Sequence, residues 1–109
     1  MKKDTEQKIE QLQRIEQSMQ NILMQKQQFQ SQTIEIESAL NELKTSEENY
    51  KIVGNIMVKT SKEELEKDLN QKKELIELRI KTIEKQEKET KEKANKIQAE
   101  VMKEIEGEK

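Results

Sequence analysis

Apolar residues recur along this chain at alternating steps of three and four, and this spacing restricts its fold more than any other feature. Ten successive positions from residue 12 to residue 43 keep the step without a break, and eight of them are apolar. These positions are Leu12, Ile15, Met19, Ile22, Lys26, Phe29, Thr33, Ile36, Leu40 and Leu43. A repeat of 3.5 residues keeps one stripe of a helix facing a partner helix and gives a left-handed supercoil. We therefore expect about residues 4–44 to form one helix of a coiled coil.

The same spacing resumes in the second half of the chain. Its positions are Leu65, Leu69, Ile76, Ile80, Ile83, Thr90, Ala94, Ile97 and Val101, with Lys72 or Lys73 and Glu87 in the gaps. The capping-box signature SKEE at residues 61–64 predicts that a second helix begins there and runs over about residues 61–106. Folding the two arms back on each other places Leu43 near Leu65. The same fold places Ile15 near Ala94. The apolar stripes of the two helices, which we call the seam, then face each other, and we expect an antiparallel pair of helices within one chain.

The composition supports a thin core and argues against catalysis. Hydrophobic residues make up 30% of the 109 and charged residues 40%, with one Phe, one Tyr and no Trp, so a thick core cannot form. A coiled coil needs only two apolar residues per heptad, and the absence of Pro leaves long helices uninterrupted. The chain has no Cys and no His, which removes common nucleophiles, bases and metal ligands. We expect no catalytic residue, no metal and no cofactor.

Charge and hydropathy also limit the classes of partner and the cellular location that we expect. The net charge is −2, so there is no general attraction to nucleic acid. No apolar run approaches the ~20 residues that span a membrane. The N-terminal residues lead into a polar, Gln-rich segment without the apolar region of a signal peptide. We therefore expect a cytoplasmic protein that binds neither nucleic acid nor membrane.

Between the two arms lies the only run with strand-like composition, at residues 50–59. Gly54-Asn55 at its centre suits a type II′ two-residue turn, which pairs Val53 with Ile56. In that register both faces carry apolar side chains. An isolated two-stranded hairpin is marginal in water and has two bare edges, so we expect other subunits to complete it. The expected assembly residues are Tyr50, Ile52, Val53, Gly54, Ile56, Met57 and Val58.

The expected fold is mainly α and forms one domain over residues 1–109. It consists of a long antiparallel two-helix coiled coil joined by a central β-hairpin, at residues 50–59, that assembles into a shared β-barrel. The alternative is that these ten residues form a tight apolar connector packed on its own helices. That alternative is less favoured because large apolar side chains would remain half exposed.

The free ends of the two arms form a second candidate surface. Layers that hold Lys26, Glu87 and Thr90 look weak, so the outer part of the coil is expected to fray and flex. A flexible end with Ile, Leu and Met side chains can adapt to varied apolar partners. A competing interpretation is that these residues only close the coil. The candidate client-binding residues are Ile9, Leu12, Ile15, Ile97, Val101, Met102 and Ile105.

Three stretches carry a likeness to a known family. They are YKIVGNIMVK at residues 50–59, SKEEL at 61–65 and LRIKTIEKQE at 78–87. Together with the order of arm, hairpin and returning arm, they resemble the prefoldin family, and a single hairpin resembles its β type more than its α type. The resemblance covers about a third of the chain at the level of residues and all of it at the level of architecture.

That resemblance implies an ATP-independent chaperone in which two α-type and four β-type subunits join their hairpins into a double β-barrel. Six coiled coils hang from this body, hold unfolded proteins by apolar contacts at their tips, and deliver them to a group II chaperonin. By the same resemblance, the assembly residues above would form the barrel and the residues at the free ends would hold clients.

The main alternative is a purely structural coiled coil that serves as a homodimeric spacer or scaffold. An enzyme is the poorest hypothesis, because no constellation for catalysis is present. A nucleic-acid binder is also disfavoured, since basic residues alternate with acidic ones and no aromatic platform exists. The hairpin separates the chaperone from the spacer, because a spacer does not need a two-faced β segment at its bend.

Overall fold

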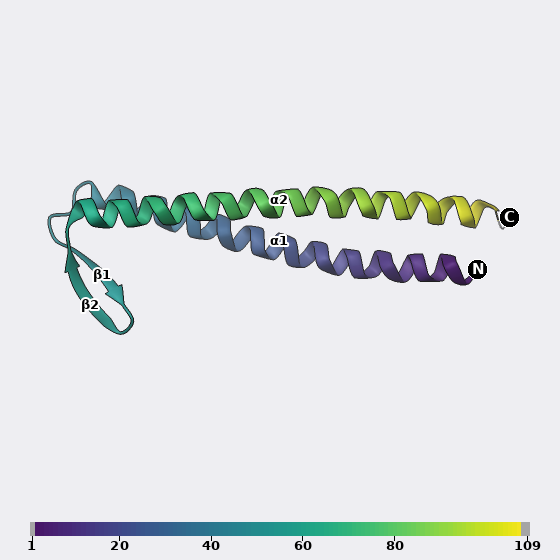
Figure 1. Cartoon of the computed structure of the whole chain (residues 1–109), viewed down its shortest axis with the longest axis horizontal. Coiled ribbons are helices and arrows are strands. Elements are labelled where there is room, and N and C mark those ends of the chain that lie inside the picture. The colour runs from purple at the N-terminus through teal and green to yellow at the C-terminus, as the bar shows by residue number, and fades with distance from the viewer. Residues whose placement is uncertain (1, 108–109) are drawn as a thin grey trace. The chain divides into compact units, whose positions relative to one another are not determined.

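Two long helices flank a short antiparallel hairpin in the computed structural model, which describes residues 2–107 (Figure 1). Helix α1 spans Lys3–Leu43 and helix α2 spans Lys62–Gly107. Strands β1 and β2 span Asn49–Val53 and Ile56–Thr60 and lie between the helices in sequence. The predicted fold class, with two long helices and a central β-hairpin, is confirmed.

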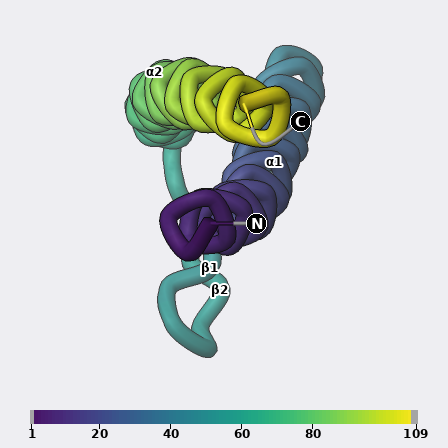
Figure 2. The backbone as a smooth tube through the Cα atoms, turned by 90° about the vertical axis from the view of Figure 1, so that its right-hand side faces the viewer, coloured from purple at the N-terminus to yellow at the C-terminus, as the bar shows by residue number. Residues whose placement is uncertain are grey.

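The chain divides into two compact units, each of which pairs a part of α1 with a part of α2. The terminal unit comprises Met1–Gln27 and Lys81–Lys109, and the hairpin unit comprises Gln28–Ile80. In the terminal unit the helices are antiparallel, and the start of α1 and the end of α2 lie at the same side (Figures 1 and 2). In the hairpin unit the helices are again antiparallel, and β1 and β2 project to one side of them (Figure 1).

Burial follows the predicted seam in both units. All ten seam positions of α1, from Leu12 to Leu43, are buried or half-buried. The buried apolar side chains of the described residues are Leu43, Ile76, Ile83, Ile97 and Val101. The large exposed apolar side chains of the helices all fall outside the seam and are Leu23, Met24, Ile34, Leu75, Leu78 and Met102. The step of three and four therefore predicted which helical residues form the core.

Charged residues that interrupt the seam are paired with the opposite helix. In the terminal unit, Lys26 Nζ lies 3.6 Å from Glu87 Oε1 and 3.9 Å from Glu84 Oε2. In the hairpin unit, Lys73 Nζ lies 3.4 Å from Glu37 Oε1. The layer that looked weak in the sequence thus places opposite charges across the seam. A polar residue at a seam position favours one register at some cost in stability, because another register would leave its charge unpaired.

The start of α2 is fixed by a side-chain cap. Ser61 Oγ accepts a hydrogen bond of 3.2 Å from the Glu64 backbone N–H, so the predicted N-cap is confirmed. The Glu64 carboxylate, which a capping box would direct back to the helix start, is engaged with the hairpin. It accepts a hydrogen bond of 3.2 Å from Thr60 Oγ1 and one of 3.4 Å from Lys51 Nζ. The same residue therefore joins the helix cap to strand β1.

The end of α1 is capped by the other helix. The last turn of α1 holds no basic residue, and its Asn41 and Glu42 carbonyl oxygens accept hydrogen bonds of 3.3 Å from the backbone N–H groups of Lys44 and Thr45. Lys62 Nζ from the first turn of α2 donates a hydrogen bond of 2.9 Å to the Lys44 carbonyl oxygen. A cation at this position also complements the negative end of the α1 dipole.

The hairpin has the predicted register. Val53 pairs with Ile56, and the antiparallel pairing continues through Tyr50 with Lys59. One further pair, between Asn49 and Thr60, extends each strand beyond the expected run. Gly54 has a φ of +62° and no other described residue has a positive φ, which excludes a type I′ turn and confirms type II′.

A matched pair of substitutions tests the seam. Ile76 is 8% exposed and Ile34 is 66% exposed, and both lie on helices of the hairpin unit. Ile76→Ala should lower the free energy of unfolding by about 2 kcal/mol or more, because it opens a cavity in the seam. Ile34→Ala should change it by less than about 0.5 kcal/mol. Urea denaturation followed by helical circular dichroism measures both, and equal losses would contradict the assigned core.

Candidate functional site

The apolar side chains of the hairpin are exposed on both of its faces. Tyr50, Ile52 and Met57 lie on one face, and Ile52 is 73% exposed. Val53, Ile56 and Val58 lie on the other face and are exposed as well. The alternative in which the hairpin packs on its own helices is therefore wrong. Within the described chain, six of the seven expected assembly residues present uncovered side chains, and the seventh, Gly54, forms the turn.

An ion pair joins strand β1 to helix α2, and an open, partly apolar groove lies beside it. Lys51 Nζ lies 3.4 Å from Glu64 Oε1, which anchors β1 to the first turn of α2. Beside this contact, an open groove runs between β1 and α2. The residues that line the groove are Lys51, Ile52, Val53, Leu65, Asp68, Leu69, Gln71, Lys72 and Leu75. Leu75, which the sequence places outside the seam near the hairpin, thus extends the apolar surface of β1 onto α2.

This arrangement suits association by strand addition. In an antiparallel pair, alternate residues on each strand direct their backbone N–H and C=O groups away from the partner strand. Strands β1 and β2 form a sheet of only these two strands among the described residues, so both outer edges are open. Open edges together with two uncovered apolar faces allow neighbouring strands to add at either side.

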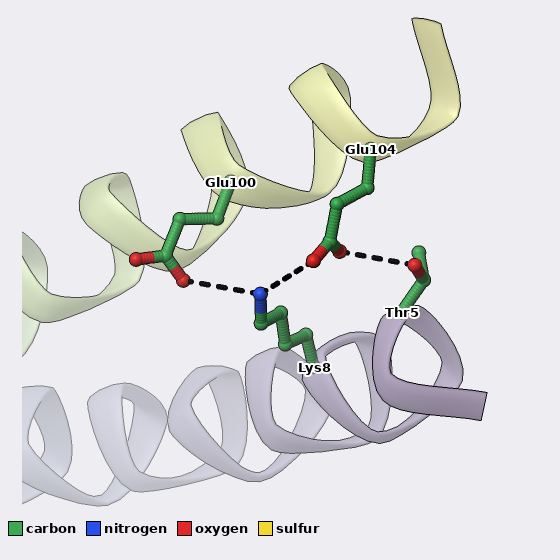
Figure 3. A network of polar contacts seen from close by, with 4 residues as sticks. All are labelled: Thr5, Lys8, Glu100 and Glu104. Carbon is green, nitrogen blue, oxygen red and sulfur yellow. Dashed lines mark hydrogen bonds and ion pairs between the residues drawn. The ribbon is translucent and has the colours of Figure 1, made fainter. Parts of the chain in front are cut away.

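A polar network joins the two helix ends in the terminal unit (Figure 3). Thr5 Oγ1 donates a hydrogen bond of 3.0 Å to Glu104 Oε2, and Lys8 Nζ donates one of 2.7 Å to Glu104 Oε1. Lys8 Nζ also lies 3.5 Å from Glu100 Oε2. Thr5 is fully buried. One carboxylate of α2 therefore holds two residues from the first turns of α1.

These contacts shift the ionisation of both partners in the direction that favours charge. The hydrogen bond from Lys8, reinforced by that from Thr5, holds the pKa of Glu104 below its ordinary value of 4.5. The hydrogen bond to Glu104 raises the pKa of Lys8 above its ordinary value of 10.5. Lys2 and Glu100 are the other charged groups that act on this pair. Both groups of the pair are thus ionised over the whole neutral range.

The residues of this network continue the three-and-four spacing of the seam beyond its last apolar residues. Counting back from Leu12 leads to Lys8 and then Thr5, and counting on from Val101 leads to Glu104. The apolar residues of the seam end at Leu12 and Val101, before these positions. The heptad spacing alone would have predicted them, because it places a lysine of one helix opposite a glutamate of the other.

The predicted residues at the free ends are gathered in the terminal unit, but most are covered. Ile97 and Val101 are each 7% exposed. Met102 is 55% exposed and faces away from the seam. The half-buried members of the set are Ile9, Leu12, Ile15 and Ile105. In this conformation these residues close the coil, as the competing interpretation describes, and client binding there stays a prediction.

Residues 2–107 contain no group of three or more His, Cys, Asp or Glu side chains placed to hold a metal ion. Within the same residues, neither α1 nor α2 has a stretch apolar enough to cross a bilayer.

The ionisation of Glu104 provides a direct test of the terminal network. Its carboxyl group should titrate below pH 4.5, and Lys8→Met should move the midpoint back toward that value. Because the pKa is lowered in the folded state, the network stabilises the fold above pH 4.5, and this contribution is lost as the pH falls through the lowered value. Carboxyl NMR titration measures the midpoint, and an identical midpoint in wild type and Lys8→Met would contradict the geometry.

Comparison with known proteins identifies similar chains over nearly the whole length. A family profile described as "Prefoldin subunit" matches residues 6–108. The chain is 40% identical to "Prefoldin subunit beta" of Methanospirillum hungatei over 104 residues, which cover 93% of this chain and 87% of that one. It is 40% identical to "Prefoldin subunit beta" of Archaeoglobus fulgidus over 87 residues, which cover 77% and 75%.

A solved structure with the same arrangement is also known. The crystal structure of the prefoldin beta subunit from Thermococcus strain KS-1 superposes with a TM-score of 0.87. Its sequence is 30% identical, and the match covers 94% of this chain and 92% of that one. The similarity therefore includes both helices and the hairpin between them.

Proposed function

Because this chain belongs to the prefoldin family, as a subunit of the beta type, we propose that it acts as an ATP-independent chaperone that captures unfolded proteins. Membership in this family makes it a non-enzymatic chaperone subunit and implies assembly with alpha subunits. The finer proposal is a cytoplasmic hexamer of two α-type and four β-type subunits that delivers its clients to a group II chaperonin.

The assembly part of the proposal is carried by the exposure of the hairpin. Six apolar side chains stand on two faces, and the chain that bears them covers neither face. Burial of a large apolar side chain contributes about 1.5–3 kcal/mol, so an interface that covers several of them stabilises both the hairpin and the complex. We propose that hairpins of neighbouring subunits provide this cover in a shared β-barrel.

The client part of the proposal rests on the helix ends. The terminal unit gathers seven Ile, Leu, Val and Met side chains around one end of a two-helix coil. Met102 is uncovered, and the others become available when the two ends separate. Flexible apolar side chains of this kind adapt to partners of varied shape, which suits the capture of unfolded chains.

A purely structural role as a homodimeric coil is the competing function. The uncovered hairpin argues against it, because two helices already close their own seam and need no further partner for that purpose. A spacer would gain nothing from six exposed apolar side chains at its bend, and such surfaces promote aggregation unless a partner covers them.

Charge placed on the hairpin should prevent assembly without unfolding the coil. Ile52→Asp combined with Val58→Asp puts a carboxylate on each face, and burial of these charges would oppose association. The helical circular dichroism should persist, while the complex with an α-type partner should disappear in size-exclusion chromatography with light scattering. A matched control, Met24→Asp with Ile34→Asp, alters exposed helical residues and should leave the complex intact. A complex of unchanged mass with the hairpin variant would overturn the assembly role.

Removal of the helix ends should separate assembly from capture. A chain that lacks residues 1–15 and 96–109 keeps the hairpin and should still join an α-type partner. It should suppress the aggregation of a denatured test protein less well than the full chain, and the full chain should act equally with and without ATP. Unchanged suppression after truncation would exclude the ends as the client site, and a requirement for ATP would overturn the proposed class.

A further inference from the structure

We propose that Lys8 and Glu104 form an ionic latch that holds the two helix ends together and thereby controls access to the apolar residues of the terminal unit. This inference rests on the proposed capture of clients at these ends and adds a means of regulating it. The latch is defined by Lys8, Thr5, Glu100 and Glu104, as drawn in Figure 3.

The geometry of the latch ties the first turns of α1 to the last turns of α2. Both oxygens of the Glu104 carboxylate are used, one by Lys8 at 2.7 Å and the other by Thr5 at 3.0 Å. Glu100, one turn earlier on α2, lies 3.5 Å from the same Lys8 nitrogen. All of these contacts span nearly the full length of the sequence, so each one breaks when the two helix ends separate.

Apolar seam positions follow the latch directly, at Leu12 on α1 and Val101 on α2. Ile97 and Val101 are buried, and Ile9 and Ile105 beside the latch are half-buried. While the ends are closed, Met102 is the one large apolar side chain of this set that is exposed in the described structure. A client that binds the other residues therefore has to compete with the partner helix. The rate and extent of opening then limit capture.

The chemistry of the latch suits an end that opens. Apolar residues at positions 8 and 104 would continue the seam and hold the ends closed in water. An ion pair that is partly exposed contributes little to stability and is weakened by salt. The Lys26–Glu87 pair is exposed to a similar extent, but it lies in the interior of both helices, whereas the latch lies at the start of α1 and the end of α2. Opening should therefore begin at the latch.

The helix dipoles favour the latch only in the closed arrangement. The last turn of α2 holds no basic residue of its own, and Lys8 brings a cation from α1 to that negative end. Glu104 adds a carboxylate to the first turns of α1, where the helix end is positive and Asp4 and Glu6 already lie. When the ends separate, both helices lose these complementary charges.

Substitutions that open or close the latch test the proposal in the assembled complex. Lys8→Glu places three carboxylates together and should speed amide hydrogen exchange of residues 97–105 about severalfold. Lys8→Met with Glu104→Met replaces the charges by apolar seam residues and should slow that exchange. Lys103→Glu makes the same charge change on an exposed neighbour of Glu104 and serves as the control. Exchange in residues 28–80 reports whether each variant remains folded.

The same variants are then compared in suppression of the aggregation of a denatured test protein. Lys8→Glu should lower the complex concentration needed for half-maximal suppression, and the double Met variant should raise it. Exchange of residues 97–105 that is equal in Lys8→Glu and Lys103→Glu would overturn the latch, whatever the effect on suppression. Faster exchange with unchanged suppression would support the latch but overturn capture at these ends. The two failures are therefore distinguishable.

Salt gives a test without substitution. Raising the ionic strength from about 0.05 M to about 0.5 M shortens the range of electrostatic attraction severalfold. Exchange of residues 97–105 in the wild-type complex should become faster over this range, while the double Met variant should respond little. An equal response of both complexes would contradict an ionic latch.

Discussion

The hairpin carries three apolar side chains on each of its two faces, and all six remain 41–73% exposed beside the helices of the same chain. The reason lies in how the apolar residues are distributed. Most of those on the helices are used in a single narrow seam, which each helix buries against the other, and the six large ones outside it are exposed. No second apolar stripe is left to cover a sheet. The uncovered hairpin therefore makes this chain a component of a larger assembly, and the groove beside Leu75 extends the same surface onto α2.

The seam itself combines weak apolar layers with charged ones. Lys73 in the hairpin unit and Lys26 in the terminal unit each pair with a glutamate of the opposite helix, and Lys8 does so at the helix ends. Such pairs add little stability, but they penalise a shifted register, because a shift would leave a half-buried charge alone. A thin seam with polar layers thus favours one register of the two helices.

The sequence was sufficient to predict the elements, the seam residues and the register of the hairpin. Heptad spacing and the Gly54-Asn55 turn are local signals. They determine which side chains face the partner helix and which share a face of the hairpin. The partners of the long charged side chains were not predictable in this way. The Glu64 carboxylate contacts Lys51 of the hairpin and not the start of its own helix, and Glu84 pairs with Lys26 of the opposite helix. With 40% charged residues, several partners lie within reach of each side chain, and spacing alone does not choose among them. The latch was missed for a related reason, since a search for apolar residues ends before Lys8.

The central claim is that other subunits complete the hairpin. The most direct measurement is amide hydrogen exchange of residues 49–60 in the chain alone and in its complex with an α-type partner. The account predicts rapid exchange in the isolated chain, because a two-stranded hairpin with open edges is marginally stable, and strong protection in the complex. Equal exchange in both states would contradict it, because the hairpin would then gain no cover from its partners.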